Sequence, residues 1–537
     1  MLPCVDIWLA ILSRLPLADR FRVRWMSRFF RGFAVPPVVD TLMPHQLGHV
    51  AKLYDHYATS GELHAVDTSM MGAGKTYTTC ALASLLSVSL LVVCPTNVQA
   101  NWAAVTAAYG CAADIVSYGK LRYGSSGFTT RVADESRAYR PTDRWRDAVA
   151  AGTLLVLDEI DSVKNPTLQT AAAVALTREV FAQAGKGRGT RSRVHCIAAI
   201  PFDKEEHIVH HLRLLGYLDG GRIAAWGANR VFEPDACARF IASMPMTCGD
   251  RRSFVRKFKP ATKHKMLMDL YAGHCMPRTF FCMPPFEYGV PIETRCGYYP
   301  LASPSDEYLF TSGLRRLRES CRLIESGRAG QAGIMTRVRK ALMTVATAKI
   351  GILGRVALRI LRGDPRSKVV IAASFLEPIR QLAVLFGEHG IGVGTITGAV
   401  PAKKRTALVN AFNADSDGVR VIVGNIQCIS RGISLHDVHG GRERWVLIVP
   451  NYNAIHMQQV ARRTHRATSA SPSHVRYVFC YSSEEKRLLR TICRKMAFMK
   501  ALLHANVAPV MAFLNETGDI HEGDPAYLDT RPLALLP

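Results

Sequence analysis

Short apolar runs alternate with longer stretches of helical periodicity in two blocks of the sequence. In the first block, about residues 40 to 220, the apolar runs that predict strands are Leu63–Asp67, Leu90–Pro95, Leu154–Asp158 and Val194–Ile200. In the second block they are Val369–Ala373, Gly392–Ile396, Val419–Val423, Trp445–Val449 and Val475–Cys480. Strands that alternate with helices are typical of parallel sheets. The pattern therefore predicts an α/β protein with two parallel-sheet lobes.

The stretches outside these blocks complete a five-part prediction. Apolar residues at near-helical spacing from Ile7 to Leu15 predict a small N-terminal helical module, and Pro36-Pro37 is a natural boundary after it. Between the blocks the pattern is less regular and the positive charge is clustered. The predicted parts are the helical module 1–36, the first lobe 38–221, a basic inter-lobe segment 222–335, the second lobe 336–500 and a tail 501–537.

Composition and charge favour a globular protein with a polyanionic partner. Hydrophobic residues make up 48% and charged residues 21% of the 537 residues, which excludes wholesale disorder. Lys and Arg number 68 against 43 Asp and Glu, which gives a formal charge of +25. Nucleic acid is the usual partner for such an excess. An arginine-rich composition without such a partner is the alternative.

Neither a membrane span nor a metal or disulfide framework is predicted. The most apolar run, Ala81–Cys94, is interrupted by serines and is too short to cross a bilayer, and no secretory signal is visible. The 14 cysteines contain no C-x-x-C pair, so reduced thiols in an intracellular protein are expected. Cys275, Cys282 and Cys296 are irregularly spaced and are interpreted as core residues.

A glycine-rich loop between a predicted strand and a predicted helix is the first candidate site. The run Met71-Gly72-Ala73-Gly74-Lys75-Thr76 opens the predicted helix Tyr77–Leu86. Glycines let backbone N–H groups surround phosphate oxygens, and the helix N-terminus favours negative charge. Lys75 would reach the β- and γ-phosphates, and the Thr76 hydroxyl would bind Mg²⁺. Ser69 stands where the general P-loop pattern has its first glycine.

A pair of carboxylates follows the apolar run at Leu154–Leu157. Asp158 and Glu159 come 83 and 84 residues after Lys75, at the expected end of a strand. Such a position suits a nucleotide site at the edge of a parallel sheet. Asp158 would hold Mg²⁺, and Glu159 would orient and deprotonate the attacking water. A solvated acidic turn is the alternative interpretation.

These residues resemble superfamily-two helicases, and within them the Swi/Snf-type DNA translocases, over about residues 40 to 500. Gln46, in Leu42-Met43-Pro44-His45-Gln46, matches the glutamine that reads adenine in this family. Further matches in the first lobe are Val92–Asn97 with Asn101-Trp102, Val116–Leu121, and Asp158–Asp161 with Lys164-Asn165-Pro166. The resemblance implies two RecA-like lobes that bind ATP and Mg²⁺.

The second lobe continues the resemblance in the family's order. The matching stretches are Lys368–Phe375, Gly398 with Arg405 and Phe412, Gly432–Asp437, Gln459 with Arg463 and Arg466, and Val475–Phe479. Gly432–Asp437 is similar to the version found in helicases of large eukaryotic DNA viruses. Because Gln459, Arg463 and Arg466 are spaced at i, i+4 and i+7, one helical face is predicted to carry them. Two guanidiniums there could stabilise a γ-phosphate, although a basic surface helix is the alternative.

One departure from the family concerns its third motif. The family carries hydroxyl side chains before a proline, where this chain has Ala198-Ala199-Ile200-Pro201. Those hydroxyls normally link the acidic box to the nucleic-acid groove. ATP hydrolysis is therefore expected, and the coupling of hydrolysis to motion is an open question.

A basic stretch in the inter-lobe segment is a candidate nucleic-acid contact. Between Arg251 and Lys265 there are seven cations and no carboxylate, with Phe254 and Phe258 interleaved. The residues predicted to bind the phosphate backbone are Arg251, Arg252, Arg256, Lys257 and Lys259. A solvated basic loop is the alternative.

The first 33 residues resemble an F-box, through stretches such as Leu2-Pro3, Ile11-Leu12-Ser13 and Leu15-Pro16. That resemblance implies docking on a Skp-type ubiquitin-ligase adaptor; a helical hairpin packed on the first lobe is the alternative.

The whole chain predicts an ATP-hydrolysing translocase that acts on DNA, duplex more than RNA, in the nucleus or a viral factory. The rival functions are an F-box adaptor whose helicase body binds substrate, and a viral transcription-associated nucleoside triphosphatase.

Overall fold

The computed structural model describes residues 41–132, 138–185, 190–204, 207–216, 271, 276–284, 289–325 and 333–503. The chain divides into two compact units, one made mainly of Met1–Phe286 and one made mainly of Glu287–Ala497. The predicted F-box-like module 1–36, the basic residues between Arg251 and Lys265, and the chain after residue 503 lie outside the described residues.

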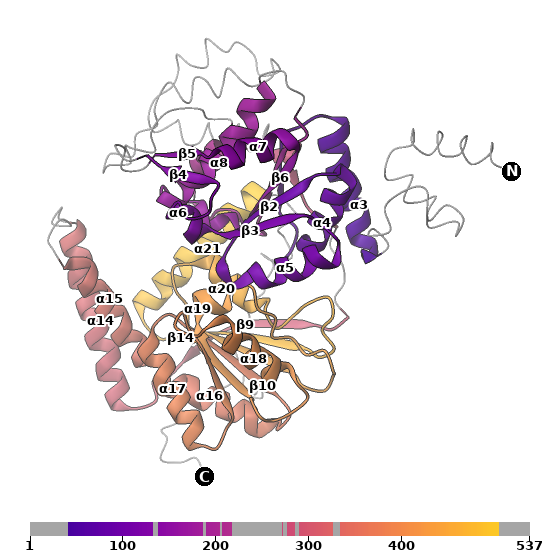
Figure 1. Ribbon diagram of the computed structural model, residues 1–537. Helices are drawn as coiled ribbons and strands as arrows, with labels where there is room; N and C mark the ends of the chain where they lie inside the picture. The colour runs from indigo at the N-terminus through magenta and orange to yellow at the C-terminus, as the bar shows by residue number, and fades with distance from the viewer. Residues whose placement is uncertain are drawn as a thin grey trace. The chain divides into compact units, whose positions relative to one another are not determined.

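The first unit is built on a six-stranded parallel sheet in the order β3-β2-β6-β7-β1-β8 (Figure 1). Its strands are β1 (His64–Asp67), β2 (Ser89–Cys94), β3 (Ala113–Ser117), β6 (Thr153–Asp158), β7 (Arg193–Ile197) and β8 (Phe280–Phe281). A small antiparallel hairpin joins β4 (Thr129–Arg131) to β5 (Tyr139–Pro141).

The central strands β2 and β6 are mostly apolar because both faces of the sheet are buried. Alternate residues of β6 belong to two separate cores: Leu155 and Leu157 pack in one, Leu154 and Val156 in the other. The helices are α3 (Pro44–Tyr54), α4 (Lys75–Leu86), α5 (Gln99–Ala108), α6 (Tyr118–Arg122), α7 (Asp143–Ala151), α8 (Leu168–Gly185), α9 (His207–Leu214) and α13 (Met276–Thr279), with short turns η3 (Asp55–Thr59), η4 (Thr96–Val98) and η5 (Ile160–Val163).

The second unit has its own six-stranded parallel sheet, in the order β11-β12-β10-β13-β14-β9. Its strands are β9 (Ile292–Tyr299), β10 (Lys368–Ala373), β11 (Val393–Ile396), β12 (Val421–Asn425), β13 (Arg444–Ile448) and β14 (Ser473–Cys480). The helices are α14 (Pro304–Glu325), α15 (Ile334–Thr347), α16 (Ile350–Gly363), α17 (Leu376–Glu388), α18 (Ala402–Asn413), α19 (Ile426–Ile429), α20 (Ala454–Ala461) and α21 (Ser483–Leu503). Figure 1 shows α14 and α15 side by side as a helical hairpin.

The predicted fold class, with two parallel-sheet lobes of RecA-like type, is confirmed by these two sheets. The extent of the irregular segment was wrong. Within the predicted inter-lobe stretch 222–335, β8 belongs to the first sheet, whereas β9 pairs with β14 in the second sheet along all eight of its residues. Because β9 is an edge strand with half-buried polar residues, it lacks the apolar run that marks a central strand.

One described helical stretch, Ile334–Gly363, is long and apolar enough to cross a membrane by length and composition. In this structure 56% of its most apolar 18-residue window is buried, and the stretch comprises two helices, α15 and α16. Between them lies Lys349, whose ammonium is buried and contacts Glu485 at 2.5 Å. The α16 residues Ile352, Leu353 and Val356 are fully buried in the core of the second unit. This stretch is accounted for as core.

Candidate functional site

The predicted phosphate loop joins β1 to α4 and depends on two glycines. Gly72 and Gly74 have φ values of 83° and 87°, in the left-handed region that favours glycine. Gly74 is the N-cap of α4. A Cβ atom on Gly74 would lie 2.1 Å from Nε2 of Gln46, so a larger residue there would displace the Gln46 side chain as well as strain the backbone. The loop therefore presents its backbone N–H groups and the N-terminus of α4, as an anion site requires.

Gln46 on α3 lies directly against this loop. Its side-chain Nε2 donates a hydrogen bond of 2.8 Å to the carbonyl of Ala73, and its Oε1 accepts a bond of 2.9 Å from the amide of Met43. Gln46 is 5% exposed. The structure thus brings together Gln46 and the loop Met71–Thr76, as the sequence predicts for adjacent parts of one nucleotide site.

The ammonium of Lys75 folds back over the inside of the loop. It donates to the carbonyls of Ser69 at 2.7 Å and Met70 at 3.1 Å. A bound triphosphate offers the same ammonium stronger acceptors, because charge-assisted bonds to phosphate oxygens outmatch bonds to neutral carbonyls. Lys75 is thus positioned to exchange loop carbonyls for phosphate oxygens.

The start of the loop is fixed by a buried acid–imidazole pair. Asp67 accepts from the amide of Ser69 at 2.8 Å and lies 3.1 Å from Nε2 of His49, with both side chains fully buried. Burial alone would raise the pKa of Asp67, but His49 and the charge of Lys75 hold this pKa well below its usual value. Asp67 is therefore an ionised anchor beneath the loop, which sequence reasoning missed.

The predicted acidic box lies at the carboxyl end of β6. Trp102 donates its indole N–H to Oδ2 of Asp158 at 2.8 Å, and the Tyr118 hydroxyl donates to the Asp158 carbonyl at 2.9 Å. Burial and repulsion from Glu159 raise the pKa of Asp158 to about 7. A buried carboxyl whose pKa is raised by a neighbouring carboxylate is typical of a site that binds a cation.

Glu159 has an unusual backbone conformation. Its φ is 53°, and among the described residues other than glycine only Ser87 shares a positive φ. A left-handed non-glycine residue costs about 1–3 kcal/mol and persists only where its surroundings hold it. The turn η5 follows immediately and ends at Lys164. The predicted general base therefore lies in a strained turn directly after the strand that carries Asp158.

An ion pair joins the segments that follow β6 and β7. The Lys164 ammonium lies 2.7 Å from Asp203, with side chains 12% and 3% exposed. These neighbouring strands end in register, with Asp158 opposite Ile197. The segment after β7 is the one that begins Ala198-Ala199-Ile200-Pro201, where the hydroxyls of the resembling family are missing. A buried ion pair therefore connects the chain just after the acidic box to the segment that follows β7.

The residues present fit a magnesium ion bound together with a triphosphate. Mg²⁺ prefers oxygen ligands and is usually held by one or two protein groups plus phosphates and waters. The Asp158 carboxylate and the Thr76 hydroxyl are such donors, and a cation would relieve the repulsion between Asp158 and Glu159. Within the described residues there is no cluster of three or more His, Cys, Asp or Glu that could hold a metal ion.

In the second unit the predicted helical face for the arginines is wrong. α20 ends at Ala461, so Gln459 is helical while Arg463 and Arg466 lie in the irregular chain that follows. Arg463 donates to the carbonyl of Ser430, and both arginines donate to the carbonyl of Ile433, at 3.4 and 3.5 Å. The two guanidiniums therefore do not lie along one helix. Both contact the segment just before Leu435.

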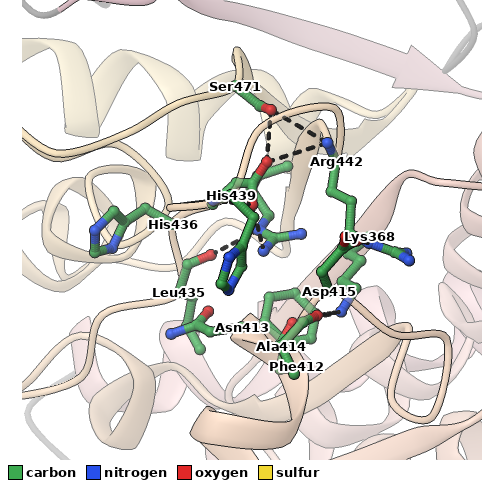
Figure 2. Close-up of polar contacts among 12 residues, drawn as sticks. Lys368, Phe412, Asn413, Ala414, Asp415, Leu435, His436, His439, Arg442 and Ser471 are labelled. Atoms are coloured by element: carbon green, nitrogen blue, oxygen red, sulfur yellow. Dashed lines mark hydrogen bonds and ion pairs between the residues drawn. The ribbon is translucent and has the colours of Figure 1, made fainter.

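A buried carboxylate fixes that segment to the sheet (Figure 2). Asp437 accepts from the hydroxyl of Ser471 at 2.6 Å and from the amide of Arg442 at 3.1 Å, and its carboxylate lies 3.6 Å from Arg444. Burial would raise the pKa of Asp437, but these hydrogen bonds and the charge of Arg444 lower it. The stretch Gly432–Asp437 is therefore tied to the first residue of β13.

Lys368 lies next to the same group of charged residues. Its buried ammonium donates to the carbonyls of Phe412 and Ala414, both at 2.7 Å, at the end of α18. Arg442 contacts Asp415 and Asp417 at 2.5 and 2.7 Å, as Figure 2 shows for Asp415. Burial and the charges of Arg444 and Arg442 lower the pKa of Lys368 to about 8.

Comparisons with known proteins place these motifs in context. No family model matches the chain. The chain is 24% identical over 481 residues to a protein of Acanthamoeba polyphaga mimivirus named "Putative ATP-dependent RNA helicase", which covers 86% of this chain and 83% of that protein. It is 28% identical over 111 residues, 21% of this chain and 22% of the relative, to the "Probable global transactivator" of Orgyia pseudotsugata multicapsid polyhedrosis virus.

Among solved structures, the chain matches the Sulfolobus solfataricus SWI2/SNF2 ATPase core in complex with dsDNA. The match has 15% sequence identity, covers 89% of this chain and 95% of that one, and has a TM-score of 0.30. The sequence likeness to the mimivirus protein runs through both units, so the chain is similar to a helicase-type ATPase along most of its length.

Proposed function

We propose that this chain is an ATP-dependent translocase or helicase of superfamily two, Swi/Snf-like, that acts on DNA. The observation that carries the proposal is the first-unit site. The Lys75 ammonium lies inside a loop with two left-handed glycines, on the same parallel sheet whose strand β6 ends in Asp158 and Glu159. The names of the similar proteins, an RNA helicase and a DNA-bound ATPase core, support the same class.

The first-unit residues would perform most of the hydrolysis. The loop amides and Lys75 would hold the phosphates, and Gln46 would contact the adenine. Glu159 would orient a water and accept its proton as the water oxygen attacks the γ-phosphorus, while the bond to the β–γ bridging oxygen breaks. Mg²⁺, held by Thr76 and Asp158, would neutralise charge on the β- and γ-phosphate oxygens.

The second-unit residues would complete the site when the units close on ATP. Arg463 and Arg466 already share the Ile433 carbonyl, so they can move as one group with the segment that carries them. A guanidinium exchanging a carbonyl for a γ-phosphate oxygen gains a charge-assisted bond. Opening after hydrolysis would then give a step along the nucleic acid.

A rate measurement with one variant tests the proposal. Glu159→Gln keeps the size of the side chain and removes its basicity, so ATP binding should persist while turnover falls about 100-fold or more. Glu62→Gln, at an exposed position of the same unit, is the matched control and should keep the wild-type rate. An equal loss in both variants, or no loss in Glu159→Gln, contradicts the assignment.

The same assay identifies the nucleic acid. ATPase rates are compared without nucleic acid and with single-stranded DNA, duplex DNA and RNA. The proposal expects the largest stimulation with duplex DNA. Stimulation by RNA alone would keep the motor and change its substrate, as the name of the mimivirus relative suggests for that protein. No stimulation by any of them contradicts a nucleic-acid motor.

Residues 1–33 are proposed as an accessory that docks on a Skp-type adaptor, in the nucleus or a viral factory. Deletion of this stretch should then leave the ATPase of the remaining chain unchanged and abolish capture of a purified Skp-type adaptor. If the deletion instead destroys the ATPase while adaptor capture is never seen, the stretch is part of the first lobe.

A further inference from the structure

Ser69 occupies the position at which the general P-loop pattern has its first glycine, and the structure gives its side chain a partner. Ser69 is fully buried. Its hydroxyl oxygen accepts a hydrogen bond of 2.8 Å from the backbone amide of Met283, which lies 214 residues further along the chain. A glycine at position 69 would leave that buried amide without this acceptor.

The partner segment is fastened to the loop at several points. β8 pairs in parallel with β1, with Val66 opposite Phe280 and Asp67 opposite Phe281. The amide of Thr68 donates to the carbonyl of Phe281 at 2.8 Å, and the Thr68 hydroxyl donates to the same carbonyl at 3.2 Å. Met283 itself is 3% exposed. The run Phe280–Met283 thus contacts the chain from Val66 to Ser69, which leads into the phosphate loop.

This run is also the stretch that leads to the second unit. The first unit ends at Phe286 and the second begins at Glu287, three and four residues after Met283. The hydrogen bond from Met283 to Ser69 therefore lies only a few residues before the point at which the chain passes from the first unit to the second. A shift at Ser69 has a short covalent path into the second unit.

Ser69 also touches the group that must respond to a triphosphate. Its carbonyl accepts the Lys75 ammonium at 2.7 Å, and its amide is held by Asp67 at 2.8 Å. When Lys75 turns to phosphate oxygens, the Ser69 carbonyl loses its charged partner, while the hydroxyl of the same residue still holds Met283. Because one residue makes both bonds, a shift of Ser69 after its carbonyl loses Lys75 would also move the hydroxyl that holds Met283.

We propose that Ser69 is a positioning residue that transmits the state of the phosphate loop to the connector Phe280–Met283, and through it to the second unit. This inference rests on the proposed ATPase and adds a route from nucleotide binding to movement. The route uses the residue that departs from the general P-loop pattern, and it is separate from the Lys164–Asp203 ion pair.

The test measures hydrogen exchange of the backbone amides at residues 280–283 in the full chain, with and without a non-hydrolysable ATP analogue and Mg²⁺. The wild type is expected to change its exchange rates in this stretch when the analogue binds. Ser69→Ala removes only the hydroxyl and is expected to lose that response while its analogue affinity stays within about threefold. Its nucleic-acid-stimulated kcat should fall about tenfold with little change in KM, as for loss of a coupling between sites.

Ser192→Ala is the matched control. Ser192 is also fully buried in this unit, and its hydroxyl oxygen accepts a hydrogen bond of 2.7 Å from the backbone amide of Thr153. Ser192→Ala should lower stability and keep the nucleotide response at residues 280–283. A second variant, Ser69→Gly, restores the general P-loop residue and should behave as Ser69→Ala if the hydroxyl is what matters.

The outcomes separate the inference from the proposed function. If the wild type binds the analogue but exchange at residues 280–283 does not change, or if Ser69→Ala responds as the wild type does, the coupling is refuted and the ATPase stands. If the wild type neither binds nor hydrolyses ATP, the proposed function fails and the inference fails with it. A lost response in Ser192→Ala as well would reduce the effect to general destabilisation and overturn the role of Ser69.

Discussion

The side-chain amide of Gln46 donates a 2.8 Å hydrogen bond to the carbonyl of Ala73, between the two glycines of the phosphate loop. The same amide nitrogen would lie 2.1 Å from a Cβ on Gly74, so the loop conformation and the glutamine are matched to each other. A residue proposed to contact adenine is therefore also a support of the phosphate loop. The base and the phosphates of one nucleotide would therefore contact two parts of the protein, Gln46 and the phosphate loop, that are hydrogen-bonded to each other.

Replacing Gln46 tests this double role. Gln46→Ala removes the bond to Ala73 and the proposed contact to the base, so ATP affinity should fall about tenfold, in line with one or two lost hydrogen bonds. Discrimination of ATP from GTP should fall with it. Nucleotide titrations by fluorescence measure both quantities.

His45→Ala is the control for Gln46, because His45 contacts the same Ala73 carbonyl at 3.4 Å but has no proposed contact with the base. It should retain the preference for ATP. If His45→Ala and Gln46→Ala lose that preference equally, Gln46 does not read adenine.

Asp158→Asn is expected to inactivate the enzyme and stabilise the metal-free protein. The pKa of Asp158 is raised to about 7, from the ordinary aspartate value of 3.8. Between these two pH values the folded state binds more protons than the unfolded state, so this residue makes the folded protein less stable as pH rises. Asparagine removes that effect, and Tm at pH 8 without nucleotide or metal should rise by about 2–4 °C.

The advantage of Asp158→Asn should shrink as the pH falls from 8 to 5, where the wild-type carboxyl is protonated. Thermal melts at several pH values, with ATPase assays at pH 8, give both readouts. A lower Tm of Asp158→Asn at pH 8, or wild-type ATPase activity, would contradict the account of this carboxylate.

Arg463→Ala should reduce kcat about 100-fold or more while ATP affinity changes about threefold or less, because its guanidinium is proposed to act on charge that develops during transfer. Arg463→Lys should not restore the rate, since an ammonium lacks the planar fork. The exposed Arg380, paired with Glu377 at 2.7 Å, provides the control Arg380→Ala. Single-turnover kinetics distinguish this result from the alternative, a loss of ATP affinity at constant kcat.

Lys368→Met should destabilise the second unit by about 1–3 kcal/mol, because two buried carbonyls at the end of α18 lose their donor. Lys403→Met, exposed on the same helix, should change stability by less than about 0.5 kcal/mol. Urea denaturation followed by tryptophan fluorescence measures this, since Trp445 lies in the second sheet. Equal stability of the two variants would show that Lys368 does not anchor α18.

The sequence was most informative where one physical requirement governs a whole stretch. Central strands such as β6 and β10 are buried on both faces, so their apolar runs predicted them to within about a residue. The edge strand β9 is half polar and was missed. The left-handed turn at Glu159 has no local signal, since a non-glycine residue there is held by its surroundings.

Within the site, local spacing predicted the contents and tertiary contacts decided the arrangement. The glycine loop with Lys75 was predicted, and so were the carboxylates Asp158 and Glu159, because each is a short motif at the end of a single strand. The end of α20 at Ala461 could not be read from the i, i+4, i+7 pattern, because Arg463 is held instead by the carbonyls of Ser430 and Ile433. Long-range pairs such as Ser69 with Met283 leave no trace in sequence spacing.

The central claim is that Lys75, Glu159 and Arg463 act on a single triphosphate. The most direct measurement is an experimental structure of the Glu159→Gln variant with ATP, Mg²⁺ and duplex DNA. The account predicts the Lys75 ammonium and the Arg463 guanidinium both within hydrogen-bond distance of the γ-phosphate, with Arg463 released from Ser430. ATP bound at Lys75 in a closed, DNA-bound complex, with Arg463 still on the Ser430 carbonyl and remote from the phosphates, would contradict it.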